Sequence, residues 1–168
     1  TVFRGGKGSL LEGGLRVPYF VRWPGKIKPA SVTDHLCYFT DVMPTLAEAA
    51  GAKTPGDIDG ISFLPTLLGK RGQKAHDFLY WEYAGQVAVR KGKWKAYMSR
   101  RQGWQLFDLE KDTLEANDLA RTHPEILKEM TDYAKSARIP PKGGGWIDHD
   151  KRYINPRSRK PRRKPQPR

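Results

Sequence analysis

The stretch GGKGSLLEGG, residues 5–14, decides how the first part of this chain is interpreted. Five of its ten residues are glycine, and they surround one lysine, Lys7, and one glutamate, Glu12. Glycine has no Cβ atom, so its backbone can approach a ligand closely, and successive N–H groups in such a turn can surround an anion. Lys7, flanked by Gly6 and Gly8, adds a compact positive charge that suits a sulfate or phosphate oxygen. On these residues alone, the alternative is a mobile loop with a solvated lysine; a P-loop is excluded, because the order G-x-x-x-x-G-K-[ST] is absent.

Two apolar segments follow this loop. Residues 16–23 are rich in β-branched and aromatic side chains and are predicted to form a strand covered on both faces. Residues 40–50 are predicted to form a helix that begins at Thr40 as N-cap, and a short helix is expected between Ser62 and Gly69. The apolar face expected for the longer helix consists of Val42, Met43, Leu46, Ala47 and Ala50. Because an isolated strand cannot bury two faces, residues 1–72 are expected to be the end of a larger α/β domain.

Residues 73–140 have a different pattern. Strands are predicted at residues 78–84, 86–90, 94–98 and 104–109, with a glycine-containing hairpin turn around Gly92. A helix is predicted to start at a capping box formed by Thr122 and Glu125 and to bury one stripe of side chains, namely Ile126, Leu127, Met130, Tyr133 and Ala134. The segment is therefore expected to be a small antiparallel sheet covered by one helix. Its aromatic residues are interpreted as core and cross-strand pairs, with carbohydrate stacking as an alternative for one or two of them.

The basic charge is concentrated at the C-terminus. The chain has 31 Lys and Arg against 18 Asp and Glu, but residues 151–168, from Lys151 to Arg168, contain nine of the basic residues and no acid. Residues 141–168 are therefore expected to be a glycine-rich linker and a disordered basic tail, which is either simply solvated or contacts a polyanion. No run of apolar residues is long enough to predict a membrane span. Cys37 is the only cysteine, so neither an intrachain disulfide nor a cysteine-based zinc site is expected.

Five blocks of the sequence carry a resemblance to a known family. GGKGSLLEGGLRVPYFVRWPGKI (5–27) resembles the pattern G-G-K-G-[ST]-x-x-E-G-G-x-R-V-P of the type I, formylglycine-dependent sulfatases. The blocks FTDVMPTL (39–46), DGIS (59–62), AVRKGKWK (88–95) and LFDLEKD (106–112) are similar to further segments in the family's order, and the last continues through Glu115 and Asn117. Phe107 and Thr113 depart from the usual tyrosine and proline. The resemblance covers residues 1–130.

This resemblance implies an α/β fold like that of alkaline phosphatase, of which the chain holds the C-terminal part: the end of the large sheet domain and the small antiparallel sheet with one helix. It implies hydrolysis of sulfate esters, either aryl or carbohydrate sulfates, by a formylglycine nucleophile and a Ca²⁺ ion. Lys7 matches the lysine that contacts the substrate sulfate, so Lys7 is the expected catalytic residue, and Gly6, Gly8 and His35 are expected to lie near the substrate. A periplasmic or secreted location is also implied by the family.

The nucleophile and the metal ligands that the family uses are not found in this chain. Cys37 is followed by Tyr38, Phe39 and Thr40, so it does not stand in a C/S-x-P-S-R motif, and the D-[NH]-G that supplies metal ligands is absent. The chain is therefore expected to be the C-terminal portion of a sulfatase, to lack an N-terminal part, to bind no metal itself and to be inactive alone. A non-catalytic polyanion-binding module and a phosphonate or phosphodiester hydrolase are the alternatives.

Several other polar residues are interpreted as structural. Glu12 is expected to pair with Arg16 or with loop N–H groups, and the turn with Asp57 and Asp59 is expected to lead into a helix rather than to bind calcium, since it lacks the distal glutamate of an EF-hand. The other candidates, Asp148, His149 and Asp150, are expected to be exposed.

Overall fold

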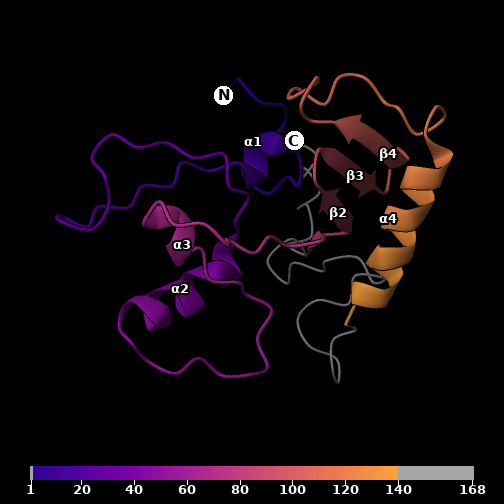
Figure 1. Ribbon diagram of the computed structural model, residues 1–168. Coiled ribbons are helices and arrows are strands. Elements are labelled where there is room, and N and C mark those ends of the chain that lie inside the picture. The colour runs from indigo at the N-terminus through magenta and orange to yellow at the C-terminus, as the bar shows by residue number, and fades with distance from the viewer. Residues whose placement is uncertain (1, 140–168) are drawn as a thin grey trace, which may run out of the picture. The chain divides into compact units, whose positions relative to one another are not determined.

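The four strands predicted between residues 78 and 109 form one sheet. They are β1 (Leu79–Tyr83), β2 (Gln86–Lys91), β3 (Trp94–Ser99) and β4 (Gly103–Asp108), in the order β1-β2-β3-β4 (Figure 1). The structure is a computed structural model that describes residues 2–139. β2 pairs antiparallel with β3, and β3 pairs antiparallel with β4. The predicted small antiparallel sheet is confirmed, and Gly92 allows the tight turn between β2 and β3 because its φ is +53°.

One face of the sheet is covered by helix α4 (Pro124–Ala137). Side chains alternate between the two faces of a strand, and Val89, Ala96 and Leu106 on the α4 face are fully buried. Met130 and Ala134 of the predicted helical stripe are also buried. The predicted capping box is wrong: the N-cap is His123, which makes no side-chain cap bond, and the Thr122 hydroxyl donates instead to the carbonyl of Leu119.

The opposite face of the sheet packs against residues close to the N-terminus. A short helix that the sequence analysis did not predict, α1 (Glu12–Leu15), follows the glycine-rich loop. The buried apolar residues on this side form one cluster, and its members are Leu10, Leu11, Ala88, Tyr97, Phe107 and Leu109. Segments that are more than 70 residues apart in the sequence are thus joined in one core.

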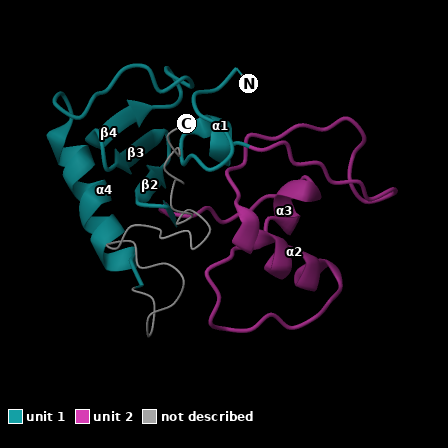
Figure 2. Cartoon of the chain, turned by 180° about the vertical axis from the view of Figure 1, so that it is seen from behind, with its two compact units in different colours: residues 1–16, 80–168 teal, residues 17–79 magenta. Residues whose placement is uncertain are grey.

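The described residues divide into two compact units (Figure 2). The sheet unit contains residues 2–16 and 80–139, and the helical unit contains residues 17–79. The structure therefore groups residues 2–16 with the small sheet and not with residues 17–72; the expected boundaries of the sulfatase domains stay a prediction. The helical unit contains the 3₁₀-helix η1 (Phe39–Asp41) and the helices α2 (Val42–Ala49) and α3 (Leu64–Leu67).

Three predictions for residues 16–50 are wrong. Residues 16–23 do not form a strand, because a strand needs a neighbour to complete its hydrogen bonds and none of the described strands pairs with them. In α2 the buried residues are Pro44 and Thr45, whereas Met43 and Leu46 of the predicted apolar face are exposed. Thr40 is not the cap of this helix either: the N-cap is Asp41, whose carboxylate makes no cap bond to α2 and instead accepts the N–H groups of Tyr38 and Ile61.

The predicted short helix is present as α3. The N-cap of α3 is Phe63, which makes no side-chain cap bond, so the predicted cap at Ser62 is wrong; the Ser62 hydroxyl instead accepts the N–H of Leu64, the first residue of the helix, over 3.2 Å. Among residues 2–139, no helix has the length and apolar character needed to cross a membrane.

Candidate functional site

The glycine-rich loop has a defined backbone conformation. Gly5 and Gly8 have φ angles of +79° and +83°, a region that side chains other than glycine rarely adopt. The N–H of Ser9 donates to the carbonyl of Gly6 over 2.9 Å, and the N–H of Leu11 donates to the Ser9 hydroxyl over 3.1 Å. These bonds close a compact turn around Lys7.

The last two glycines of the stretch allow backbone segments to pack against each other. A Cβ atom on Gly14 would lie 2.0 Å from the carbonyl oxygen of Ser9, and one on Gly13 would lie 2.5 Å from that of Gly5. No side chain fits at such distances, and backbone atoms cannot move aside easily. Because the two backbone segments are so close, the N–H of Gly13 donates to the carbonyl of Arg4 over 2.8 Å.

The side chain of Gln86 on β2 connects this loop to the sheet by hydrogen bonds. The amide nitrogen of Gln86 on β2 donates to the carbonyl of Gly8 over 2.9 Å, and its oxygen accepts the N–H of Leu10 over 3.2 Å. The Tyr97 hydroxyl donates to the same oxygen over 2.9 Å. Gln86 therefore bonds to the loop on both sides of Ser9 and connects it to β2 and β3.

A buried cluster of charges, which we call the buried ion cluster, lies at the end of the loop. It consists of Glu12, Lys95 and Glu115, which are at most 4% exposed. Lys95 Nζ lies 2.8 Å from Glu12 Oε1 and 2.8 Å from Glu115 Oε1. The N–H of Glu12 also donates to Glu115 Oε2 over 2.7 Å. A buried lysine needs such partners, because an unpaired charge in the protein interior is strongly destabilising.

Arginines complete the surroundings of this cluster. Arg90 Nη1 lies 3.8 Å from Glu12 Oε2, and burial lowers the pKa of Arg90 from its usual value. Arg4 donates to the carbonyl of Glu115 over 2.6 Å. Arg16, which the sequence analysis expected as the partner of Glu12, lies 4.0 Å away and is half exposed. The structural role predicted for Glu12 thus fits the geometry, but its main partner is Lys95.

Glu115 reaches the cluster from an irregular loop. Its φ is +55°, and the Asp112 carboxylate fixes the turn by accepting the N–H groups of Ala116 and Asn117. Glu12, Lys95 and Glu115 stand in separate blocks of the sequence resemblance, but nothing in their local pattern indicates that they meet. The sequence analysis missed Lys95 and Glu115, since contacts across 83 and 103 residues leave no periodic signal.

Lys7 itself is exposed, and no acidic side chain of the described residues pairs with it. Within residues 2–139, the N–H groups of Gly6, Lys7 and Gly8 donate to no protein acceptor. Three backbone donors and one ammonium group are therefore available on a loop whose conformation is fixed from both ends. Such an arrangement can bind an anion.

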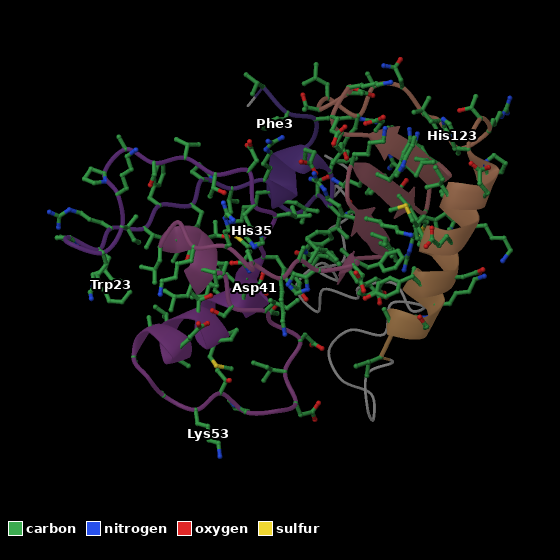
Figure 3. The ribbon with its side chains drawn as sticks, viewed as in Figure 1. Phe3, Trp23, His35, Asp41, Lys53 and His123 are labelled. Atoms are coloured by element: carbon green, nitrogen blue, oxygen red, sulfur yellow. The ribbon has the colours of Figure 1, made fainter. Side chains whose placement is uncertain are left out.

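His35 and Asp41 lie in the helical unit (Figure 3). His35 is half-buried, its ring lies 6.5 Å from that of Phe63, and burial lowers its pKa. Asp41, which is 1% exposed, accepts the N–H of Tyr38 over 3.0 Å and that of Ile61 over 2.8 Å, and it lies 2.8 Å from His76 Nε2. Asp41 thus links the segments around Tyr38, Ile61 and His76. Lys7, Gly6 and Gly8 belong to the sheet unit, so the expected site residues are divided between the two units.

The residues that the structure describes do not fit a calcium site. No three Asp, Glu, His or Cys side chains among them are grouped so that they could hold a metal ion. Asp57 and Asp59 are exposed, and Asp148, His149 and Asp150 lie outside the described residues, as does the basic tail. Burial raises the pKa of the Cys37 thiol, which does not favour a reactive thiolate.

Comparisons with known proteins show to which family the chain is similar. The family described as N-sulphoglucosamine sulphohydrolase, C-terminal, matches residues 6–138. The chain is 37% identical over 141 residues to an uncharacterised sulfatase of Schizosaccharomyces pombe, which covers 76% of this chain and 26% of the relative. It is 31% identical over 154 residues to an N-acetylgalactosamine-6-O-sulfatase of Bacteroides thetaiotaomicron, covering 82% of this chain and 30% of the relative.

A solved structure gives the same result. A Bacteroides thetaiotaomicron structure described under the metabolism of multiple glycosaminoglycans superposes with a TM-score of 0.64 at 30% identity, and the match covers 80% of this chain and 32% of that one. The chain belongs to the sulfatase family and corresponds to a C-terminal portion of it. It spans between a quarter and a third of the length of these relatives.

Proposed function

We propose that this chain is the C-terminal part of an enzyme that hydrolyses sulfate esters, and that Lys7 contacts the substrate sulfate. The observation that carries the proposal is the exposed ammonium group of Lys7 on a loop that Gln86 and the buried ion cluster fix from both ends. Gly6 and Gly8 would add backbone N–H donors to the sulfate. His35 is proposed as a further residue near the substrate.

The chemistry of sulfate transfer explains why a fixed lysine is useful. Negative charge on the sulfuryl oxygens and on the leaving oxygen changes as the ester bond breaks. Donors that are already oriented toward these oxygens stabilise the transition state without reorganising. A loop that moved freely would lose this advantage, because displacement of a catalytic group by about 1 Å can reduce the rate about 100-fold. The constraints on residues 5–14 are therefore consistent with a catalytic loop.

We propose that the formylglycine nucleophile and the Ca²⁺ ligands are supplied by residues outside this chain. The sequence has no C/S-x-P-S-R motif for a formylglycine, and the described residues form no Ca²⁺ site. We therefore propose that the 168-residue chain is inactive alone and that an N-terminal part supplies both groups. The exposed apolar side chains of the helical unit support this, since Phe20, Phe39 and Leu46 are 89%, 91% and 63% exposed.

The substrate class is proposed from the relatives. They include an N-acetylgalactosamine-6-O-sulfatase and an ulvan-active sulfatase, as well as steryl-sulfatases. A sulfated carbohydrate is the substrate that we propose, with the basic residues 151–168 as a contact to the polyanion. A periplasmic or secreted location accords with such a substrate.

Sulfate binding by the loop can be tested on the chain itself. Titration of ¹⁵N-labelled protein with sodium sulfate should shift the amide resonances of Gly6, Lys7 and Gly8 in a saturable manner. Lys7→Ala should abolish this shift, whereas Lys53→Ala, which removes an exposed lysine of the helical unit, should leave it unchanged. Equal responses of the two variants would argue against the Lys7 site.

Catalysis is tested in the complete enzyme. Lys7→Ala is expected to lower kcat/KM for 4-nitrophenyl sulfate about 100- to 1000-fold, as for loss of one oriented oxyanion donor. Lys53→Ala is the matched control and should not change kcat/KM. An unaltered kcat/KM in Lys7→Ala would remove Lys7 from the site, and turnover of the ester by the pure 168-residue chain would refute the proposed inactivity.

A further inference from the structure

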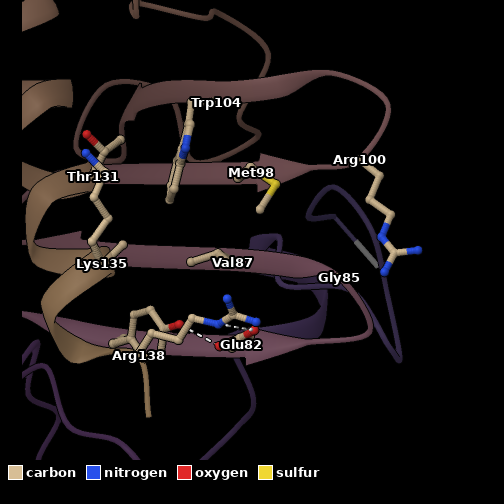
Figure 4. A pocket seen from close by; sticks show the side chains of 11 residues that line it. Glu82, Gly85, Val87, Met98, Arg100, Trp104, Thr131, Lys135 and Arg138 are labelled. Carbon is tan, nitrogen blue, oxygen red and sulfur yellow. Dashed lines mark hydrogen bonds and ion pairs between the residues drawn. The ribbon is translucent and has the colours of Figure 1, made fainter. Parts of the chain in front are cut away.

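A cavity of about 330 Å³ lies on the face of the sheet that carries α4 (Figure 4). Its floor is formed by Val87, Met98 and Trp104, which are aligned across β2, β3 and β4. These three side chains are only half-buried, whereas Val89, Ala96 and Leu106 on the same face are fully buried. Helix α4 therefore covers one part of the sheet and leaves an apolar floor open beside it.

This cavity and the glycine-rich loop lie on opposite faces of the sheet. Val87 and Met98 point to the α4 side, and their neighbours Ala88 and Tyr97 belong to the core that packs against Leu10 and Leu11. Successive side chains of a strand point to opposite sides. A ligand in the cavity would therefore not meet Lys7 within the sheet unit, and the function proposed above does not use the cavity.

The polar groups around the floor are one oriented carboxylate and several cations. Glu82 Oε2 accepts the hydroxyl hydrogen of Tyr80 over 2.7 Å, and Glu82 Oε1 lies 3.4 Å from Arg138 Nε. Arg100 and Lys135 also line the cavity, so it has three cations against one carboxylate. Lys135 is 77% exposed and also pairs with Asp132 at 2.9 Å, so its ammonium group lies at the solvent-facing rim.

We propose that this cavity binds one unit of an anionic, sulfated sugar. A sugar ring has apolar C–H faces that pack on an indole or thioether, hydroxyl groups that donate to a carboxylate, and an anionic substituent that suits arginine and lysine. Trp104 and Met98, Glu82, and the cations provide these three kinds of contact. The volume is near the lower end of the range of about 300–1000 Å³ for small-molecule sites, which accords with one sugar unit.

The alternative ligands fit less well. An inorganic anion would use only the cations and would leave the apolar floor in contact with water. A neutral apolar molecule would use only the apolar floor and would gain nothing from the positive charge of Lys135 and Arg138 at the cavity. The combination of contacts therefore indicates a ligand that is both ring-shaped and anionic.

The test uses the full chain, labelled with ¹⁵N, and glucose 6-sulfate as the probe. The chain has five tryptophans, and Trp104→Phe identifies the Trp104 indole resonance by its loss. We expect this resonance to shift saturably with glucose 6-sulfate in the millimolar range, and glucose and sodium sulfate to act at least about 10-fold more weakly. Because the readout is local, binding of the probe to the basic residues 151–168 does not produce it.

Variants on the two faces make the test specific. Arg138→Gln is expected to weaken binding about 5- to 10-fold, and Lys7→Ala, on the other face, is expected to leave it unchanged. Absence of a saturable shift, or an equal response to sodium sulfate, would overturn the proposal. Loss of the shift in Lys7→Ala would also overturn it, because the probe would then be bound at the loop. If glucose 6-sulfate does not bind at the cavity, the response of the Gly6 and Gly8 amides to sulfate is unaffected. The two proposals are therefore tested separately.

Discussion

The sheet unit and the helical unit of this chain differ in how completely they enclose their apolar side chains. The sheet unit buries Lys95, a charged residue, completely, and it has an apolar core on each face of the sheet. The helical unit buries Phe63 and Leu64 but exposes most of the surface of Val17, Phe20, and Phe39. A charged side chain can therefore be fully buried in this molecule. Contacts between residues that are far apart in the sequence decide which side chains are enclosed.

The largest expected effect is that of Lys95→Met in the sheet unit. It leaves Glu12 and Glu115 buried without their cation, so we expect the free energy of unfolding in urea to fall by about 3–5 kcal/mol. Lys53→Met in the helical unit is the control and should change this free energy by less than about 0.5 kcal/mol. A similar small change in both variants would mean that the buried ion cluster does not stabilise the fold.

One substitution made in both units compares their apolar residues directly. Leu106 is fully buried in the sheet unit and Leu46 is 63% exposed in the helical unit. Leu106→Ala is expected to cost about 2–5 kcal/mol, because it removes buried methyl groups and leaves a cavity. Leu46→Ala should cost less than about 0.5 kcal/mol in the same unfolding experiment. Comparable losses would show that Leu46 is enclosed in solution.

A smaller effect is expected from Gly14→Ala. The new methyl group would lie 2.0 Å from the carbonyl oxygen of Ser9, so the loop backbone must shift, at a cost of about 1–3 kcal/mol. Gly56→Ala in the helical unit is the matched control, because no atom lies within 4 Å of the added methyl group. Thermal unfolding followed by circular dichroism distinguishes the two. Equal melting temperatures would contradict the close packing of residues 9 and 14.

The smallest effect concerns an exposed ion pair on α4. Hydrogen bonds from Lys128 and Lys135 lower the pKa of Asp132 to about 2. Because the folded pKa is lower than the unfolded value, the contribution of Asp132 to stability is complete above about pH 4 and is lost as the pH falls toward 2. A carboxyl ¹³C titration should show this pKa, and Lys128→Ala should raise it. An unchanged pKa in Lys128→Ala would contradict the pairing.

Local sequence pattern was sufficient for the sheet and for α4. Runs of aromatic and β-branched residues bounded by turn residues predicted the strands to within a few residues, and the stripe around Met130 and Ala134 predicted the buried face of the helix. The same reasoning failed for residues 16–23, because strand propensity cannot supply a neighbouring strand. It also failed for Thr40, since the acceptor that organises that turn is the carboxylate of Asp41, which bonds to Ile61 in the next segment.

The candidate site was predicted only in part. The glycines and Lys7 were singled out as a candidate anion-binding loop, because glycine and lysine have suitable properties in any context, and this role stays a prediction. The residues that fix the loop were not, because Gln86, Lys95 and Glu115 reach it from 76 to 103 residues away. Sequence reasoning thus named the groups proposed to touch a ligand and missed the groups that hold the loop in place.

The link from Arg4 to Glu115 has a consequence for the order of folding. It joins the beginning of the chain to residue 115, across 111 positions. During synthesis the glycine-rich loop leaves the ribosome before its partners on β2, on β3 and after β4. Contacts of such separation form only after the intervening chain has been closed into a loop. We therefore expect residues 4–14 to reach their final conformation only after the sheet that supports them has formed.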